Sequence, residues 1–215
     1  MEFLNHSIDL FHKGGPVMYL LAICSLSVVA IAVERVLYYK NAFANTQAFH
    51  QALQPLLEKQ RLNDAIQLCE QKPHTLSQVA LAGLLASQRN GQVENALESS
   101  ATLAADRLRE RLDDLSTIVT LAPLLGLLGT VIGMIDSFSV FNVQSGQPMA
   151  ITGGVGEALV ATATGLSVAT LALVSHSYFS RRVNRMISDI EQTAALIISY
   201  MPLKKAARRE THEIA

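Results

Sequence analysis

One stretch of the chain, residues 150–182, limits the possible folds more than any other. From Met149 to Ser180 it holds apolar and small residues with a single acid, Glu157, and a single histidine, His176. A helix needs about 20 mostly apolar residues to cross a bilayer, and this run is longer than that. A carboxylate within such a helix must face protein, water or a partner, because lipid does not solvate it. The stretch therefore predicts a membrane-spanning helix that carries a functional acid.

Two further runs predict two more spans. Residues 16–40 carry no charge from Val17 to Val33, and residues 115–141 are mostly apolar with one charged side chain, Asp136, near their end. Pro16 suits the first position of a helix, and a proline inside the second run is tolerated where neighbouring helices satisfy the freed carbonyl. Glu34 and Arg35 are adjacent in sequence and do not face each other on a helix, so we expect them to snorkel to the interface or to pair with other segments.

The start of the chain allows other interpretations. Ala30-Ile31-Ala32 is similar to a signal-peptide cleavage site, but acids rather than a basic region precede the apolar run. We therefore expect an uncleaved helix. Residues 1–15 have apolar side chains at helical spacing before two glycines, which predicts an amphipathic helix in the membrane interface or, alternatively, a frayed tail.

The remaining residues are polar and helical in pattern. Half of the 215 residues are hydrophobic and 16% are charged, a mixture of membrane and soluble parts. Apolar positions three and four apart, with Pro73 and Asn90-Gly91 between them, predict short helices before one long helix over residues 94–119. That helix is expected to enter the membrane without a break, and the third span to continue as a helix into the tail.

These patterns predict an all-α integral membrane protein. It has three transmembrane helices, two of them extending far into the cytoplasm, and a small helical cytoplasmic domain. The expected parts are an N-terminal periplasmic or interfacial helix (1–15), a first span (16–40), the cytoplasmic domain (41–114), a second span (115–141), a periplasmic turn (142–149), a third span (150–182) and a cytoplasmic tail (183–215).

The distribution of basic residues predicts the orientation. Residues 142–149 contain no lysine or arginine, and Lys13 is the one basic side chain before the first span. The polar domain and the tail carry the others. Under the positive-inside rule the N-terminus faces the periplasm and the C-terminus faces the cytoplasm of a multi-pass inner-membrane protein.

Small residues form a stripe on each of the last two spans. They recur at threes and fours, as is typical of close helix packing, and such a stripe can also line a narrow polar path. Their positions are Gly126, Gly129 and Gly133 on the second span and Ala158, Ala161 and Gly165 on the third. Packing alone does not account for Glu157 with Thr162 and Thr164, a carboxylate and hydroxyls that can hold water and pass protons. There are two alternatives: Glu157 reaches the lipid headgroups near the outer membrane boundary, or the protein is a structural scaffold in which Glu157 is dispensable.

Other chemistries find no support in the sequence. No nucleophile–base set, phosphate loop or metal cluster is present, so neither an enzyme nor a metal or other cofactor is expected. Cys24 and Cys69 are isolated and predict no disulfide. No basic, aromatic patch indicates nucleic acid, so the expected surroundings are membrane lipid and protein partners.

Two motifs carry a resemblance to a known family. LAPLLGLLGTVIGMIDSF, followed by GGVGEALVATATGLSVA and then an aromatic residue before two arginines, resembles the MotA/TolQ/ExbB proton-channel family over nearly the whole chain. Within the family the chain looks most like the ExbB branch. The likeness weakens at Ala169-Thr170-Leu171-Ala172 and at His176-Ser177, where relatives show an AIPA-like run and then Tyr-Asn.

The resemblance implies a homopentamer around a pore, with an ExbD- or TolR-like single-span subunit inside it. Thr130, Glu157 and Thr162 match the family's pore-facing positions, and an aspartate of the partner takes the proton. Proton flow through this motor subunit would energise a TonB-like protein for outer-membrane import. The alternative is a TolQ-like subunit of the Tol-Pal envelope-maintenance motor. A sodium ion is a second possible coupling ion, and the resemblance favours protons.

Overall fold

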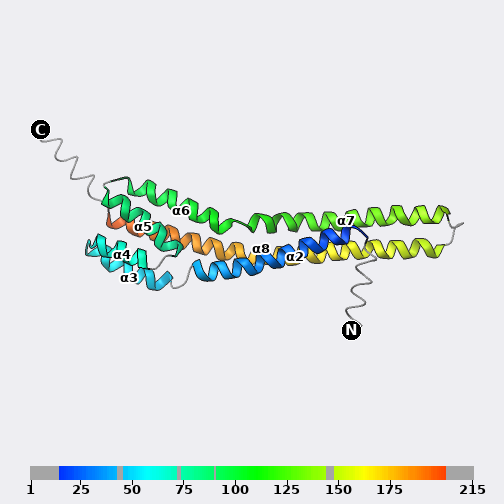
Figure 1. Cartoon of the computed structure of the whole chain (residues 1–215), viewed down its shortest axis with the longest axis horizontal. Helices are drawn as coiled ribbons and strands as arrows, with labels where there is room; N and C mark the ends of the chain where they lie inside the picture. Colours follow the sequence, from blue (N-terminus) through cyan, green and yellow to red (C-terminus); the bar gives the residue numbers. More distant parts are fainter. Residues whose placement is uncertain (1–14, 43–45, 72–73, 90, 144–147, 202–215) are drawn as a thin grey trace. The chain divides into compact units, whose positions relative to one another are not determined.

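Helices form the regular structure of the described residues, and no strand occurs among them (Figure 1). The computed structural model describes residues 15–42, 46–71, 74–89, 91–143 and 148–201, without the side chains of 41–42, 140–143, 148–154 and Glu157. The helices are α2 (Val17–Ala42), α3 (Thr46–Glu58), α4 (Leu62–Gln71), α5 (Thr75–Gln88), α6 (Val93–Arg109), α7 (Leu112–Val143) and α8 (Pro148–Tyr200). The amphipathic helix expected within residues 1–15 falls almost wholly outside the described residues, as does the end of the tail.

Three stretches are long and apolar enough to cross a membrane: Val17–Lys40, Val93–Ser139 and Ala158–Tyr200. The all-α architecture with three spans, predicted from the sequence, is confirmed. The third span also continues into the tail as expected, because α8 runs through 53 residues as one helix.

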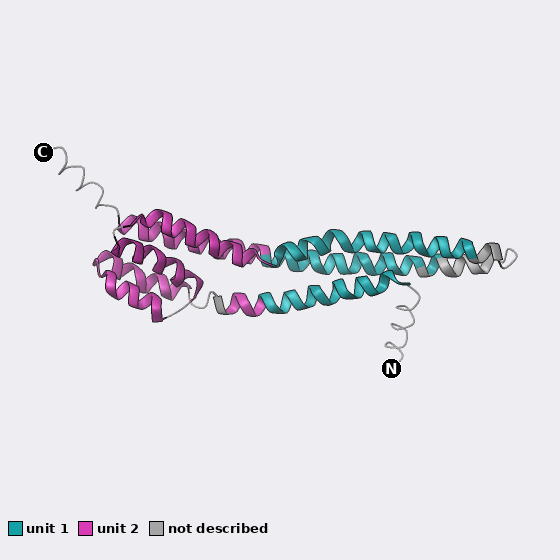
Figure 2. Ribbon diagram, turned by 45° about the horizontal axis from the view of Figure 1, so that its top comes forward, with its two compact units in different colours: residues 1–35, 111–179 teal, residues 36–110, 180–215 magenta. Residues whose placement is uncertain are grey.

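The chain forms two compact units (Figure 2). Unit 1 comprises residues 1–35 and 111–179, so it holds most of α2, all of α7 and the first part of α8. Its buried side chains include Leu21, Ala122 and Ala172. Many of its exposed side chains are large and apolar, and Leu26 is 72% exposed. Such a surface in water would be costly, and it suits lipid or other subunits.

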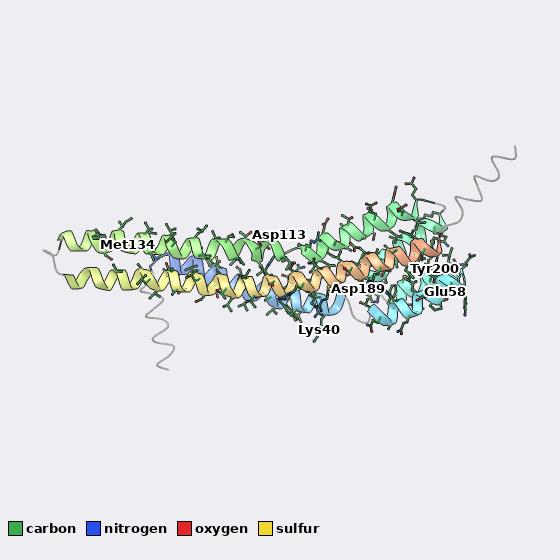
Figure 3. All side chains as sticks on the ribbon, turned by 180° about the vertical axis from the view of Figure 1, so that it is seen from behind. Lys40, Glu58, Asp113, Met134, Asp189 and Tyr200 are labelled. Atoms are coloured by element: carbon green, nitrogen blue, oxygen red, sulfur yellow. The ribbon has the colours of Figure 1, made fainter. Side chains whose placement is uncertain are left out.

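Unit 2 comprises residues 36–110 and 180–215, and helices α3 to α6 pack in sequence order within it. Phe49, Leu84 and Leu97 belong to its core, together with Ile190 and Ile197 from α8. Two polar contacts join α3 to α8. His50 Nε2 lies 2.8 Å from the hydroxyl of the buried Thr193, and the Tyr200 hydroxyl donates to Glu58 at 3.0 Å (Figure 3).

The expectation of one unbroken helix over residues 94–119 is wrong. α6 ends at Arg109 and α7 begins at Leu112, because Glu110 is extended (φ −45°, ψ 140°) and Arg111 has φ +69°. A positive φ is unfavourable for a residue with a Cβ, so neighbouring contacts must hold Arg111 in place. Its guanidinium contacts Asp114 at 3.5 Å and Glu34 of α2 at 3.9 Å.

Candidate functional site

The small-residue stripes of α7 and α8 lie against each other in unit 1. A Cβ added to Gly129 would stand 2.6 Å from the Ala161 Cβ, and one added to Gly133 would stand 2.8 Å from the Ala158 Cβ. Neither distance leaves room for a methyl group. The two helices run antiparallel, and their approach depends on the absence of side chains at these glycines.

The closest approach joins Gly126 and Gly165. A Cβ on Gly165 would lie 2.6 Å from the Ala122 carbonyl oxygen and 3.0 Å from the Gly126 Cα. A Cβ on Gly126 would lie 3.0 Å from the Ala161 carbonyl oxygen. These obstacles are backbone atoms, which cannot rotate away as the end of a side chain can. Gly126 and Gly165 therefore set the spacing of the helix pair.

A hydrogen bond crosses the pair at this point. The Thr162 hydroxyl on α8 donates to the Gly126 carbonyl oxygen on α7 at 2.9 Å. A hydroxyl has one hydrogen and two lone pairs, so this bond uses its donor and leaves acceptor capacity. Thr162 is half-buried in the single subunit. Thr162 therefore links the two helices through its donated hydrogen bond, and its oxygen can still accept a hydrogen bond from a further group.

The other hydroxyls of this region bond within their own helices. Thr130 donates to the Leu127 carbonyl at 2.7 Å, and Thr164 donates to the Val160 carbonyl at 2.8 Å. Thr130 follows Gly126 by one helical turn, so it lies on the stripe of α7 that Thr162 contacts. No direct Thr130–Thr162 bond is present.

Glu157 belongs to α8, one residue before the buried Ala158, and its side chain is not among those that the structure describes. Ala158 packs against Gly133, and Ala161 packs against Gly129. The backbone at Glu157 therefore stands at the edge of the small-residue contact. Thr162 follows five residues later, about one and a half turns along the helix.

A charged cluster in unit 1 differs from the sequence expectation. Arg35 Nη2 lies 3.3 Å from Glu34 Oε1, so these neighbours do contact each other, contrary to what adjacency suggested. The long arginine side chain reaches back to the preceding carboxylate. Arg35 is only 3% exposed, and Arg111 approaches the second oxygen of Glu34. Pairing with another segment was expected, and Arg111 supplies it.

Sequence reasoning missed the Thr162–Gly126 bond and the part played by Arg111. A threonine near a glycine stripe is a sequence signal that could have predicted the Thr162–Gly126 bond. No local sequence signal predicts the role of Arg111, because arginine rarely adopts a positive φ. Among the described residues no three His, Cys, Asp or Glu side chains are placed to hold a metal ion.

Together these features define a class of protein. It is a membrane-spanning α-helical protein whose last two spans pack through glycine and alanine and are joined by a hydrogen bond from a hydroxyl of one to a carbonyl of the other. Comparison with protein-family models assigns the chain to one family within that class. The model described as "MotA/TolQ/ExbB proton channel family" matches residues 70–192, more than half of the chain. The chain belongs to the MotA/TolQ/ExbB proton channel family.

Individual relatives agree with this assignment. A putative biopolymer transport protein ExbB homolog of Methanothermobacter thermautotrophicus is 29% identical over 89% of this chain and 69% of its own length. The biopolymer transport protein ExbB of Neisseria meningitidis is 29% identical over 86% of this chain and 91% of its own. The Tol-Pal system protein TolQ of Pseudomonas aeruginosa is 33% identical, but over only 44% of this chain and 42% of its own. The longer matches favour an ExbB-like member over a TolQ-like one.

Proposed function

We propose that this chain is a proton-conducting subunit of an inner-membrane motor. The observation that carries the proposal is the family match, which includes Thr130, Glu157 and Thr162. The packed helices α7 and α8 support it, because they hold the Thr162 hydroxyl on a fixed acceptor about one and a half turns along α8 from Glu157. An acid in a membrane helix has a functional role by default, since it is costly to keep there.

In the proposed assembly five copies surround a pore. The large apolar side chains on the outside of unit 1 would then face lipid and neighbouring copies, and the helix pair would border the pore. An ExbD- or TolR-like single-span subunit would lie inside and receive the proton on an acid of its own. The motion of that subunit would energise a TonB-like protein for outer-membrane import.

The proposed orientation places the N-terminus and residues 142–149 in the periplasm. Unit 2, with α3 to α6 and the last part of α8, would then be cytoplasmic, together with the basic tail. The proposed spans are 16–40, 115–141 and 150–182. The distribution of lysine and arginine supports this topology.

Proton flux tests the proposal directly. The chain would be purified with the single-span protein that accompanies it, reconstituted into vesicles, and driven by a pH gradient. Glu157→Gln keeps the size of the side chain and removes its titration, so flux should fall to background while the assembly keeps its mass. Glu191→Gln, at an exposed acid further along α8, is the matched control and should conduct normally.

Thr162 provides a second arm of that experiment. Thr162→Val removes the hydroxyl and should reduce flux, whereas Thr162→Ser keeps it and should restore conduction. Normal flux in Glu157→Gln would remove the acid from the proton path. The identity of the copurifying partner, ExbD-like or TolR-like, would separate import from envelope maintenance.

A further inference from the structure

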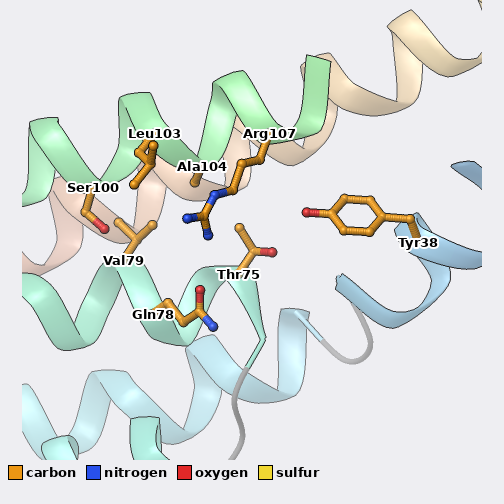
Figure 4. Close-up of a pocket in the computed structure, with 8 residues that line it drawn as sticks. All are labelled: Tyr38, Thr75, Gln78, Val79, Ser100, Leu103, Ala104 and Arg107. Atoms are coloured by element: carbon orange, nitrogen blue, oxygen red, sulfur yellow. The ribbon is translucent and has the colours of Figure 1, made fainter. Parts of the chain in front are cut away.

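A small polar cleft lies in unit 2. It has a volume of about 80 Å³, and its walls come from the end of α2, the first turns of α5 and the last turns of α6 (Figure 4). The lining residues are Tyr38, Thr75, Gln78, Val79, Ser100, Leu103, Ala104 and Arg107. Drug-sized ligands need pockets of about 300–1,000 Å³, so this cleft suits a single small group.

The chemistry of the lining favours an anion. Arg107 supplies a guanidinium, Gln78 an amide N–H₂, and the tyrosine, threonine and serine supply three hydroxyls. All of these can donate hydrogen bonds. No carboxylate is among the described residues that line the cleft, and the acids nearest to them in sequence, Glu98, Asp106 and Glu110, are exposed. Figure 4 shows the Tyr38 hydroxyl pointing from α2 toward Thr75 and Arg107.

The walls are held in place by the packing beneath them. Tyr39, next to Tyr38, is buried and donates to the Leu108 carbonyl, next to Arg107, at 2.9 Å. α5 and α6 approach closely because Gly83 has no side chain: a Cβ there would stand 2.5 Å from Leu97. These contacts preorganise the donors, which lowers the entropic cost of binding.

We propose that this cleft binds a phosphate group. A guanidinium forms charge-assisted hydrogen bonds with phosphate oxygens, and the neutral donors can satisfy the remaining ones. Tyr38 lies in the last turn of the span Val17–Lys40, where lipid headgroups are found if that helix crosses a bilayer. Leu103, 54% exposed at the rim, offers an apolar contact beside the donors. An anionic phospholipid is therefore the favoured source of the phosphate, and free inorganic phosphate is the other.

The test measures the thermal stability of the full chain in detergent against added ligands. A short-chain phosphatidylglycerol is compared with the matching diacylglycerol, which lacks the phosphate, and inorganic phosphate with chloride at equal ionic strength. We expect phosphatidylglycerol to raise the melting temperature in a saturable way and diacylglycerol to do so much less. A saturable shift with inorganic phosphate and none with the lipid would make free phosphate the ligand.

Variants connect the shift to the cleft. Arg107→Gln should weaken the apparent affinity for the phosphate ligand about tenfold or more, the loss typical of a hydrogen bond to a charged group. Arg107→Lys keeps the charge and Tyr38→Phe removes one donor, so both should be intermediate. Arg109→Gln removes a charge from the same helix outside the cleft and should bind as the unmodified chain does.

Two results would overturn the assignment. One is an Arg107→Gln affinity equal to that of Arg109→Gln, since phosphate would then bind elsewhere or only through general charge. The other is an equal response to diacylglycerol and phosphatidylglycerol, since acyl chains alone would then account for it. If Arg107→Gln does not fold, the comparison of Arg107→Lys and Tyr38→Phe with Arg109→Gln decides the question.

Discussion

Gly165 offers the sharpest test of how unit 1 is built. In Gly165→Ala the new methyl would lie 2.6 Å from the Ala122 carbonyl oxygen, whereas ordinary contact begins near 3.4 Å. The helices must therefore move apart by about 0.8 Å at this level, the difference between those distances. The obstacle is backbone, so no rotamer change relieves it. The movement would also stretch the Thr162–Gly126 hydrogen bond.

The energy follows from three effects of different sign. Overpacking a tight contact costs about 1–3 kcal/mol. A cross-helix hydrogen bond in a membrane protein is worth about 0.6 kcal/mol. Alanine regains about 1 kcal/mol over glycine in a helix interior. Gly165→Ala should therefore destabilise the folded chain by about 0.6–2.6 kcal/mol.

Gly156→Ala is the matched control on the same helix. A Cβ at Gly156 meets nothing within 4 Å, so the helix preference acts alone and the variant should be neutral or more stable. The assay is equilibrium unfolding in mixed micelles, followed by circular dichroism, for both variants in the same oligomeric state. Equal stability of Gly165→Ala and Gly156→Ala would refute the view that backbone contact at Gly165 sets the spacing of α7 and α8.

Two further predictions concern unit 2. Tyr39→Phe leaves the buried Leu108 carbonyl without its 2.9 Å donor and should lower the free energy of unfolding by about 1–3 kcal/mol in a denaturant titration. The exposed Tyr178→Phe should not, and an equal loss in both would contradict the role of the bond. Burial, with a smaller effect from Glu70, raises the pKa of Cys69 from 9.0 to about 12. In a Cys24→Ser background, Cys69 should react with maleimide at pH 8 only after unfolding, and rapid labelling of the folded chain would contradict this. The pKa of Cys69 is higher in the folded chain than in the unfolded one. The contribution of its protonation to the free energy of unfolding is therefore complete below about pH 9.0 and falls as the pH rises toward 12.

The spans could be predicted because the signal is local. A run such as residues 17–33 without charge excludes most other structures, and proline or glycine marks several helix ends in unit 2. The small stripes could be found for the same reason, since threes and fours along one helix place Gly126, Gly129 and Gly133 on one face.

Contacts between distant residues could not be predicted. Tyr39 and Leu108 are 69 residues apart, and His50 and Thr193 are 143 apart, so no periodicity connects them. The break at Glu110 and Arg111 was missed for a different reason. Alternating charges without glycine or proline are typical of a continuous helix, and the break depends on contacts that Arg111 makes with Glu34 and Asp114.

Packing and proton conduction need not be alternative roles for the stripes. Thr193 illustrates the principle in unit 2: its hydroxyl donates to the Asp189 carbonyl, so His50 Nε2 must be the donor in the second bond. At Thr162 the donor is likewise fixed, here by the Gly126 carbonyl of the other helix. Only its lone pairs remain for a water or a protonated acid on the proposed path. Gly126 permits the close approach of the helices that makes this bond. The packing of the stripe would therefore determine the direction from which the Thr162 oxygen can accept a hydrogen bond from that water or acid.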